Sequence, residues 1–275
     1  MQTLTTHRAT LLAEEAVTIA KAGSYVAPSG ATIDLSSAVE AAVGGTVEHL
    51  PDEALGPFSP RFETALEVTG ESTLTATRRL AVGGRVAALN FASARYPGGG
   101  FLTGALAQEE SLCRSSALFV CLEGRPMYGY HMRHNDPFFS DRVIWSPEVP
   151  VFRDDDGGLL DVPYSASFLS CPAPNAALIL ERDGRAGPAI EAALRQRAQR
   201  ILEVAATHGA ETLVLGAWGA GVFGNAPAVV ADAFGAALDG PLRGVFSKVV
   251  FAILSGRDPT TREVFERRFG VGTTA

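Results

Sequence analysis

The stretch VAALNFASARYPGGGFLTGALAQEE, residues 86–110, decides how this chain of 275 residues is interpreted. Residues 86–91 are apolar apart from Asn90 and predict a buried strand. The three glycines at 98–100 follow as a loop that can approach a ligand closely, because glycine has no Cβ and tolerates positive φ. The run Gln-Glu-Glu at 108–110 then opens the next helix, so the stretch predicts acid/base groups beside a ligand loop at a strand end.

Apolar strands alternate with helices from residue 64 to the end of the chain. We predict strands at residues 65–68, 86–91, 165–170, 177–180, 212–215 and 248–254. We predict helices at residues 72–80, 108–122, 189–208, 227–237 and 260–269. This alternation is typical of a mainly parallel sheet covered on both faces. Residues 128–158 interrupt it, and we expect an inserted antiparallel hairpin there.

The first 64 residues carry no obvious chemical group. We predict a helix that Thr5 or Thr6 caps, a short hairpin at residues 24–35, and a second short helix that ends near Val43. The chain contains no repeat and no linker that would divide it. The simplest organisation is an accessory extension, residues 1–64, packed on a catalytic core, residues 65–275.

Composition excludes several classes of protein. The formal net charge of −7 argues against a broad basic surface for DNA or RNA. The three cysteines form no C-x-x-C pair, so neither a disulfide framework nor a zinc site is predicted. The chain has no signal-peptide pattern and no run of about 18 apolar residues that could span a bilayer. We therefore expect a cytoplasmic protein without membrane contact, and a monomer.

The two adjacent glutamates are either part of a solvated helix face or functional groups. A Glu-Glu pair on a helix is usually a solvated face, but apolar residues follow this one. Neighbouring helical side chains diverge by roughly 100°, so Glu109 and Glu110 do not face each other across one bond. We expect one carboxylate to anchor a sugar and the other to exchange a proton. A helix N-terminus favours the charged form of a carboxylate, whereas a second carboxylate and a dry pocket oppose it, and the sequence leaves the balance open.

A second glycine-rich loop follows the strand predicted at residues 212–215. We expect it to lead into a helix that Asn225 caps and that has Pro227 in its first turn. A strand, a glycine loop and a helix N-terminus together form an anion site suited to a diphosphate. The alternative is an ordinary glycine-rich turn, in which Phe223 fills the core instead of contacting a ligand.

Two further groups are discounted. The pair His131 and His134 lacks the helical spacing and the additional ligands of a metal site, so we expect a polar surface loop there and no metal. The basic run at residues 195–200 is interpreted as the solvated face of a long helix.

The motif of three glycines, seven residues and Gln-Glu-Glu resembles that of poly(ADP-ribose) glycohydrolases, in particular their short bacterial type. The resemblance covers roughly residues 65–270, and the second glycine loop is similar to the diphosphate-binding loop of macrodomains. It implies a macrodomain-like three-layer α/β fold with a central mixed, mainly parallel sheet. The implied reaction is hydrolysis of ribose–ribose O-glycosidic bonds, mainly from chain ends, to release ADP-ribose without a metal or cofactor.

The resemblance also assigns roles to residues. Glu110 would be the general acid and then the base, and Glu109 would bind ribose hydroxyls. The expected substrate-binding residues are Asn90, Gly98, Gly99, Gly100, Gln108, Gly219, Ala220, Gly221, Val222, Phe223, Gly224 and Asn225. Two alternatives remain: a reader of ADP-ribose without catalysis, against which the glutamate pair argues, and a hydrolase of mono-ADP-ribosylated proteins.

Overall fold

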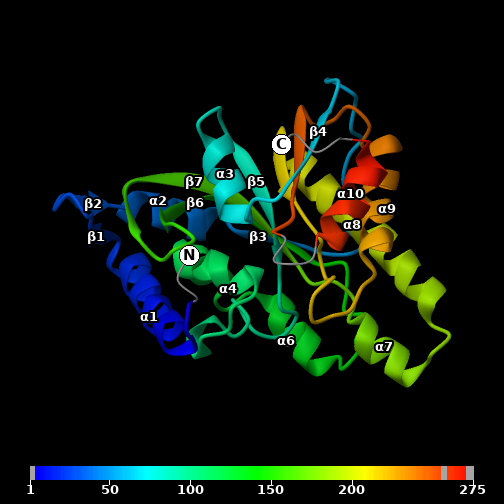
Figure 1. Ribbon diagram of the computed structural model, residues 1–275, viewed down its shortest axis with the longest axis horizontal. Coiled ribbons are helices and arrows are strands. Elements are labelled where there is room, and N and C mark those ends of the chain that lie inside the picture. The colour runs from blue at the N-terminus through cyan, green and yellow to red at the C-terminus, as the bar shows by residue number, and fades with distance from the viewer. Residues whose placement is uncertain (1–3, 255–258, 271–275) are drawn as a thin grey trace.

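The computed structural model describes residues 4–254 and 259–270, and its centre is a seven-stranded mixed sheet (Figure 1). In spatial order the strands are β3 (Val47–His49), β6 (Val143–Arg153), β7 (Leu159–Cys171), β5 (Val86–Phe91), β8 (Thr212–Leu215), β9 (Lys248–Ala252) and β4 (Ala65–Thr69). Strands β7, β5, β8, β9 and β4 are parallel to their neighbours in this order, whereas β3, β6 and β7 pair antiparallel. The predicted mixed, mainly parallel α/β fold is confirmed.

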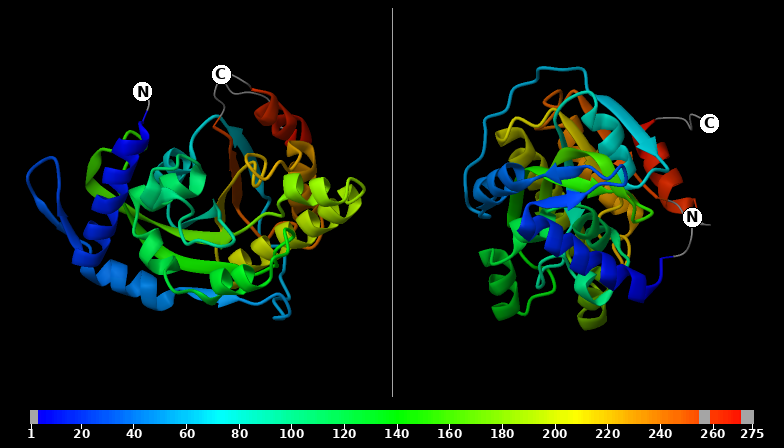
Figure 2. Two further views of the ribbon diagram at one scale, coloured as in Figure 1. Left: turned by 90° about the horizontal axis from the view of Figure 1, so that it is seen from below. Right: turned by 90° about the vertical axis from the view of Figure 1, so that its left-hand side faces the viewer.

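Helices cover both faces of the sheet (Figure 2). The helices are α1 (Thr6–Ala22), α2 (Ser36–Gly45), α3 (Thr73–Ala81), α4 (Gln108–Ser115), α5 (Leu118–Leu122), α6 (Pro126–Arg133), α7 (Ala176–Arg182), α8 (Gly187–Thr207), α9 (Pro227–Asp239) and α10 (Thr260–Phe269). Successive residues of a strand point to opposite faces. In β5, Ala87 and Leu89 therefore join the core under α7 to α10, while Val86 and Ala88 join the core under α1 to α5.

The strand order of the sheet reverses between the adjacent strands β5 and β8. From β5 it continues to β6 and β7 on one side, whereas from β8 it continues to β9 on the other. The loops that leave the carboxyl ends of these two adjacent strands therefore diverge, and such a switch point opens a crevice. The two strands also separate early, because their pairing ends at Ala88 and Val214.

The N-terminal segment folds largely as predicted. Thr5 caps α1 by accepting a hydrogen bond from the backbone of Arg8, and β1 (Ser24–Val26) pairs with β2 (Thr32–Asp34) in a separate hairpin. The strand β3, which we did not predict, follows α2 and joins the main sheet antiparallel to β6. The first 64 residues thus supply one edge strand of the sheet, and the division at residue 64 stays a prediction.

Three predicted elements were wrong in type or extent. Residues 177–180 lie in α7, where Asn175 caps the helix by accepting from the backbone N–H of Leu178. The helix predicted at 108–122 is two helices, because Ser116 is extended and pairs with Val151 of β6. The inserted segment begins with α6, which has Pro126 in its first turn, and becomes a hairpin only at β6 and β7.

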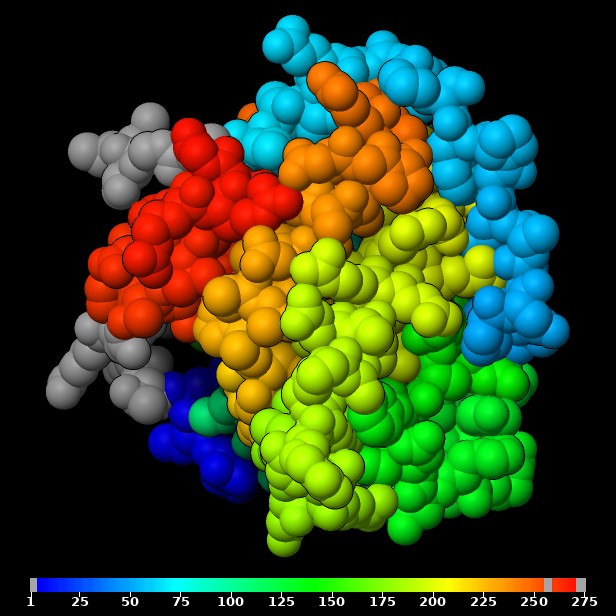
Figure 3. All heavy atoms as spheres, turned by 90° about the vertical axis from the view of Figure 1, so that its right-hand side faces the viewer, coloured from blue at the N-terminus to red at the C-terminus, as the bar shows by residue number. Residues whose placement is uncertain are grey.

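The two discounted groups are partly buried, contrary to expectation, whereas His134 and Arg195 are exposed as expected. His131 lies on α6, and its ring nitrogens contact the carbonyl of Ala94 and the hydroxyl of Ser140 at 3.1 and 2.7 Å. Arg197 and Arg200 are buried under loops whose carbonyls accept their guanidinium hydrogens. One of these loops belongs to residues 50–64, which run along the edge of the molecule beside α8 (Figure 3).

Candidate active site

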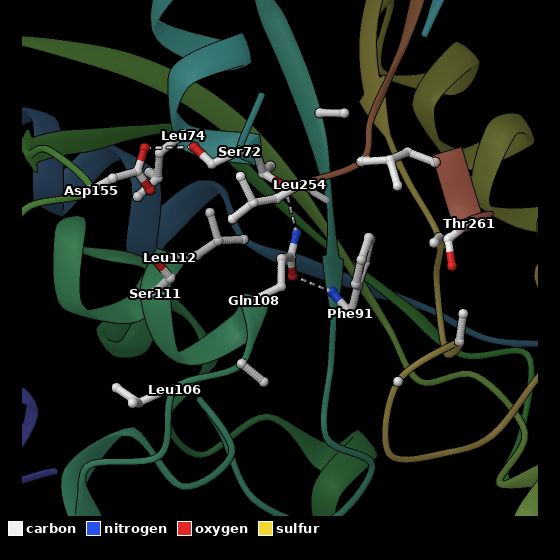
Figure 4. A pocket seen from close by; sticks show the side chains of 17 residues that line it. Ser72, Leu74, Phe91, Leu106, Gln108, Ser111, Leu112, Asp155, Leu254 and Thr261 are labelled. Carbon is white, nitrogen blue, oxygen red and sulfur yellow. Dashed lines mark hydrogen bonds between the residues drawn. The ribbon is translucent and has the colours of Figure 1, made fainter. Parts of the chain in front are cut away.

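The side chain of Gln108 fixes the first turn of α4 against the end of β5. Its Oε1 accepts from the backbone N–H of Phe91 at 2.9 Å, and its Nε2 donates to Thr73 Oγ1 at 3.1 Å (Figure 4). The same Nε2 also donates to the carbonyl of Leu89 at 2.8 Å. These backbone groups lie beyond the point where β8 stops pairing with β5. Buried backbone groups need partners, so the amide of Gln108 substitutes for the missing strand.

Glu109 is buried and fully held by the protein. The backbone N–H of Ser93 donates to its Oε2 at 2.6 Å, and Asn90 Nδ2 donates to its Oε1 at 3.3 Å. Asn90 is itself buried at the end of β5, where Nδ2 also donates to Ser170 Oγ at 2.9 Å. The orientation of this carboxyl is therefore set by two strands and by the loop after β5.

Burial raises the pKa of Glu109 to about 8, and the neighbouring charge of Glu110 adds to the rise. The hydrogen bonds from Ser93 and Asn90 act in the opposite direction, because they stabilise the charged form, but they do not offset desolvation. Glu109 thus holds a proton at neutral pH. The sequence left open whether the charged or the neutral form of the carboxyl is favoured, and for Glu109 desolvation favours the neutral form.

Glu110 is also buried but has one unoccupied oxygen. Its Oε1 accepts from the backbone N–H of Gly100 at 2.9 Å, whereas its Oε2 has no hydrogen-bond partner among the described residues. The residue lines the same cleft as Glu109. One carboxyl of the pair is therefore fixed at both oxygens, and the other keeps one buried oxygen without a partner among the described residues.

Gly99 has no room for a side chain. Its φ is +59°, and an added Cβ would overlap Glu110 Oε1 and lie 3.0 Å from Glu109 Oε2. Gly98 has φ +70° and packs against Phe101 and Cys113 in the same way. Both carboxyl groups therefore converge on the bare backbone of this loop.

A buried arginine that the sequence did not indicate supports the glycine loop. Arg114, one turn after Glu110 on α4, donates to the carbonyl of Ala105 at 2.6 Å. Arg153 of β6 donates in turn to the carbonyl of Arg114 at 3.1 Å and to Glu15 of α1 at 2.8 Å. A chain of contacts thus connects the N-terminal helix to the loop.

The second glycine loop is held by Asn225, although not as the predicted helix cap. The residue before α9 is Ala226, and the Asn225 side chain instead donates to the carbonyls of Pro174 and Gly219 at 2.8 and 3.0 Å. Gly219 has φ +74°, and an added Cβ would lie 2.5 Å from Asn225 Nδ2. Gly221 faces open space, and Val222 is 90% exposed, so the tip of the loop is accessible.

The two glycine loops line one cleft of about 400 Å³. From the predicted set it contains Gly99, Gly100, Gln108, Glu109, Glu110, Gly219, Gly221, Val222 and Phe223. Ala220 instead lines a second pocket of about 410 Å³ that shares Phe91, Gln108 and Gly221 with the first. Asn90, Gly98, Gly224 and Asn225 are not in the lining of either pocket. Ser93 and Tyr96 line the cleft without having been predicted, and no sequence signal marks them.

The part of the chain that the structure describes contains no cluster of three or more metal-ligating side chains. Within the same residues, no helix combines the length and the apolar character needed to cross a bilayer.

The fold and the site together define a macrodomain-like α/β protein with a carboxyl pair beside its first glycine loop. The family model described as microbial-type PARG, catalytic domain, matches residues 13–154. The chain belongs to this family. Among curated proteins, none matched.

Solved structures of bacterial poly(ADP-ribose) glycohydrolases are similar to the whole chain. The structure from Thermomonospora curvata is 47% identical, covers 96% of this chain and 100% of its own, and has a TM-score of 0.90. A structure of that protein bound to the inhibitor ADP-HPD is 46% identical over the same shares, with a TM-score of 0.88. The structure from Deinococcus radiodurans in complex with ADP-ribose is 42% identical, covers 84% of this chain and 96% of its own, and has a TM-score of 0.80.

The contact at Gly99 predicts that Gly99→Ala removes activity with little loss of fold. The new Cβ must displace the Glu110 carboxyl, and a displacement of about 1 Å at a reacting group costs on the order of 100-fold in rate. Gly124→Ala is the matched control, because Gly124 also has positive φ, +77°, but meets nothing within 4 Å. Both variants should lose about 1–2 kcal/mol of stability in thermal unfolding. Equal activity of the two variants would contradict the role of Gly99.

The raised pKa of Glu109 predicts a pH-dependent stability difference. Between pH 4.5, the ordinary pKa of a glutamate, and about pH 8 the unfolded chain releases this proton while the folded protein keeps it. Wild-type stability should therefore fall through that window, by up to about 1.4 kcal/mol for each pKa unit. Glu109→Gln removes the penalty and keeps an acceptor for Ser93. The melting temperature of the variant relative to wild type should rise from about pH 5 to about pH 8.5, and a constant difference would refute the shift.

Proposed function

We propose that the protein hydrolyses the ribose–ribose O-glycosidic bonds of poly(ADP-ribose), with Glu110 as the proton-transfer group. The unpaired Oε2 of Glu110 carries this proposal: it is buried beside the cleft and no described residue holds it, whereas a general acid needs an oxygen that the protein leaves without a hydrogen bond. Glu110 enters the reaction in its protonated form and gives its proton to the departing ribose oxygen as the glycosidic bond breaks through an oxocarbenium-like transition state. The resulting carboxylate then takes a proton from a water whose hydroxyl adds to the sugar, which restores the acid.

Glu109 positions the substrate in this mechanism. Its two oxygens are held by Ser93 and Asn90, so the group has a fixed orientation and little freedom to follow a moving proton. A protonated carboxyl can still donate to a ribose hydroxyl, which fits the role of an anchor. Gln108 has its amide engaged with β5 and α3, and we assign it the role of holding α4 in place while its stem lines the cleft.

The remainder of an ADP-ribose unit fits the rest of the cleft. Backbone N–H groups of the loop at residues 219–224 receive the diphosphate, apart from those of Ala220 and Gly224, which donate to the carbonyls of Ala217 and Gly221. Phe223 borders the ribose at the glutamate end. The second pocket continues past Gly221 and Ala220 toward Leu74 and Leu254, and it offers an apolar wall to an adenosine. A unit that spans both pockets reaches from the adenosine to the scissile bond.

The expected consequence for Glu110→Gln is a loss of turnover on the order of 10²–10⁴-fold, the contribution of one general acid/base group. The variant keeps the shape of the site, so its affinity for ADP-ribose should stay within a few-fold of wild type. Turnover is measured by ADP-ribose release from labelled polymer, and affinity by calorimetry. Substantial residual turnover in this variant would overturn the assignment.

We further propose that cleavage proceeds from chain ends. One end of the second pocket is bridged by Ser72 and Asp155, whose hydroxyl and carboxylate are hydrogen-bonded at 2.5 Å (Figure 4). Thr75 also donates to this carboxylate at 2.9 Å, which ties α3 to the turn between β6 and β7. This bridge restricts the space for a polymer that continues beyond the adenosine.

Cleavage from chain ends predicts a simple product pattern. During digestion of long polymer, ADP-ribose should accumulate from the first time point, and short oligomers should stay rare on sequencing gels. Asp155→Ala opens the bridge and should raise the share of oligomers. Early accumulation of oligomers by the wild-type protein would exclude the proposal.

Residues 1–64 serve as an accessory extension that supports the site from outside the catalytic core, residues 65–275. Gly104 of the first glycine loop approaches α1 so closely that an added Cβ would lie 2.8 Å from Thr6 Cγ2. The ion pair of Glu15 and Arg153 adds a second link at 2.8 Å. We assign the protein to the cytoplasm, as a monomer that binds neither DNA nor RNA, since its three thiols are free and buried and its net charge is −7.

A further inference from the structure

The turn between β5 and the glycines presents an aromatic ring that the fold does not use. Tyr96 lines the cleft with both glutamates, yet it is 62% exposed. Among the described residues, no other aromatic ring stacks on it. By comparison, Tyr25 and Tyr128 are buried in the core. This ring at the edge of the cleft therefore has a face available to a ligand.

The backbone of Tyr96 is fixed at the glutamate end of the cleft. Its N–H donates to Ser93 Oγ at 3.2 Å, and its carbonyl accepts from the N–H of Gly99 at 3.0 Å. Ser93 is the residue whose backbone holds Glu109, and Gly99 is the residue against which both carboxyls pack. The ring therefore projects from a turn that is anchored directly to the acid/base pair.

The chemistry of the scissile bond determines which group of the leaving unit lies close to the oxygen that Glu110 protonates. In a ribose–ribose linkage to the 2′-oxygen of an adenosine, the base is attached to the adjacent carbon of the same sugar. The adenine of the leaving unit therefore lies only a few bonds from the oxygen that Glu110 protonates. An aromatic ring at this end of the cleft is within reach of that base.

We propose that Tyr96 is a stacking platform for the adenine of the departing ADP-ribose unit, a leaving-group subsite that rests on the proposed function. Stacking of a base on an aromatic side chain is a common mode of recognition for exposed, single-stranded nucleotides. The neighbouring residue Arg95 adds a positive charge. Its Nη2 donates to Asn135 at 2.5 Å. Within the described chain, no carboxylate forms an ion pair with Arg95. Such a cation suits the phosphates of the same leaving unit.

The test compares three substitutions of Tyr96 on poly(ADP-ribose). Tyr96→Ala should raise KM for the polymer about tenfold, the effect of losing one base–aromatic stack, and leave kcat within a few-fold of wild type. Tyr96→Trp should restore KM, whereas Tyr96→Leu, which has bulk without an aromatic face, should not. Met132→Ala is the control, since Met132 is 54% exposed and lies outside the cleft lining.

Binding of free ADP-ribose separates the two subsites. The product occupies only the retained side of the bond, so its Kd should be the same for wild type and Tyr96→Ala. An unchanged KM in Tyr96→Ala overturns the inference, and so does a loss of ADP-ribose affinity equal to the rise in KM, which assigns Tyr96 to the retained unit. Failure of the wild-type protein to cleave polymer refutes the proposed function instead.

Discussion

The site depends on the side chain of Gln108, which takes the place of a neighbouring strand as the hydrogen-bond partner of the end of β5. Strand β8 pairs with β5 only as far as Ala88, which leaves the backbone groups of Leu89 and Phe91 without a strand on that side. Gln108 satisfies both with a single amide. Buried backbone groups cannot stay unpaired, so β5 and β8 can separate here only if α4 lies where Gln108 reaches the end of β5. The crevice and the glutamates that face it therefore arise together.

This constraint explains why two neighbouring glutamates differ in character. Helix geometry directs their side chains apart, but the glycine loop folds over the first turn of α4 and meets both. Glu109 points toward β5 and the turn after it, where Asn90 and Ser93 take both of its oxygens. Glu110 points along the loop, where only Gly100 is in reach. The difference in hydrogen bonding comes from the surroundings of the pair, since the two residues are chemically identical.

Sequence reasoning was most successful where the pattern is local. The strands at 86–91 and 212–215 and the helix at 260–269 have the predicted bounds, because each is a short apolar or amphipathic run with clear ends. It failed where a distant contact decides the outcome. Pairing of Ser116 with β6 interrupts a helix, and loop carbonyls bury Arg197 and Arg200 on a face that charge alone marks as solvated.

The candidate site shows the same contrast between features set by local sequence and features set by distant contacts. The two glycine loops and the carboxyl pair are contiguous motifs and were predicted one by one, and the structure brings them together in one cleft. The supporting residues were not. Ser93 acts through its backbone, and Arg114 acts through a carbonyl nine residues away, so the identity of neither side chain signals its task. Asn225 was assigned to the helix that follows it, because a cap is the commonest local use of asparagine, yet it holds the loop that precedes it.

The protonation of Glu109 also bears on how an acidic protein accepts a polyanion. A net charge of −7 opposes the approach of a diphosphate, and two ionised carboxylates in the same cleft would add to that repulsion. Burial removes one of these charges at neutral pH, because the pKa of Glu109 rises to about 8. The glycine loops contribute backbone N–H groups, which attract phosphate without adding side-chain charge. Attraction by the glycine loops is therefore local and dipolar, and it does not require a broad basic surface.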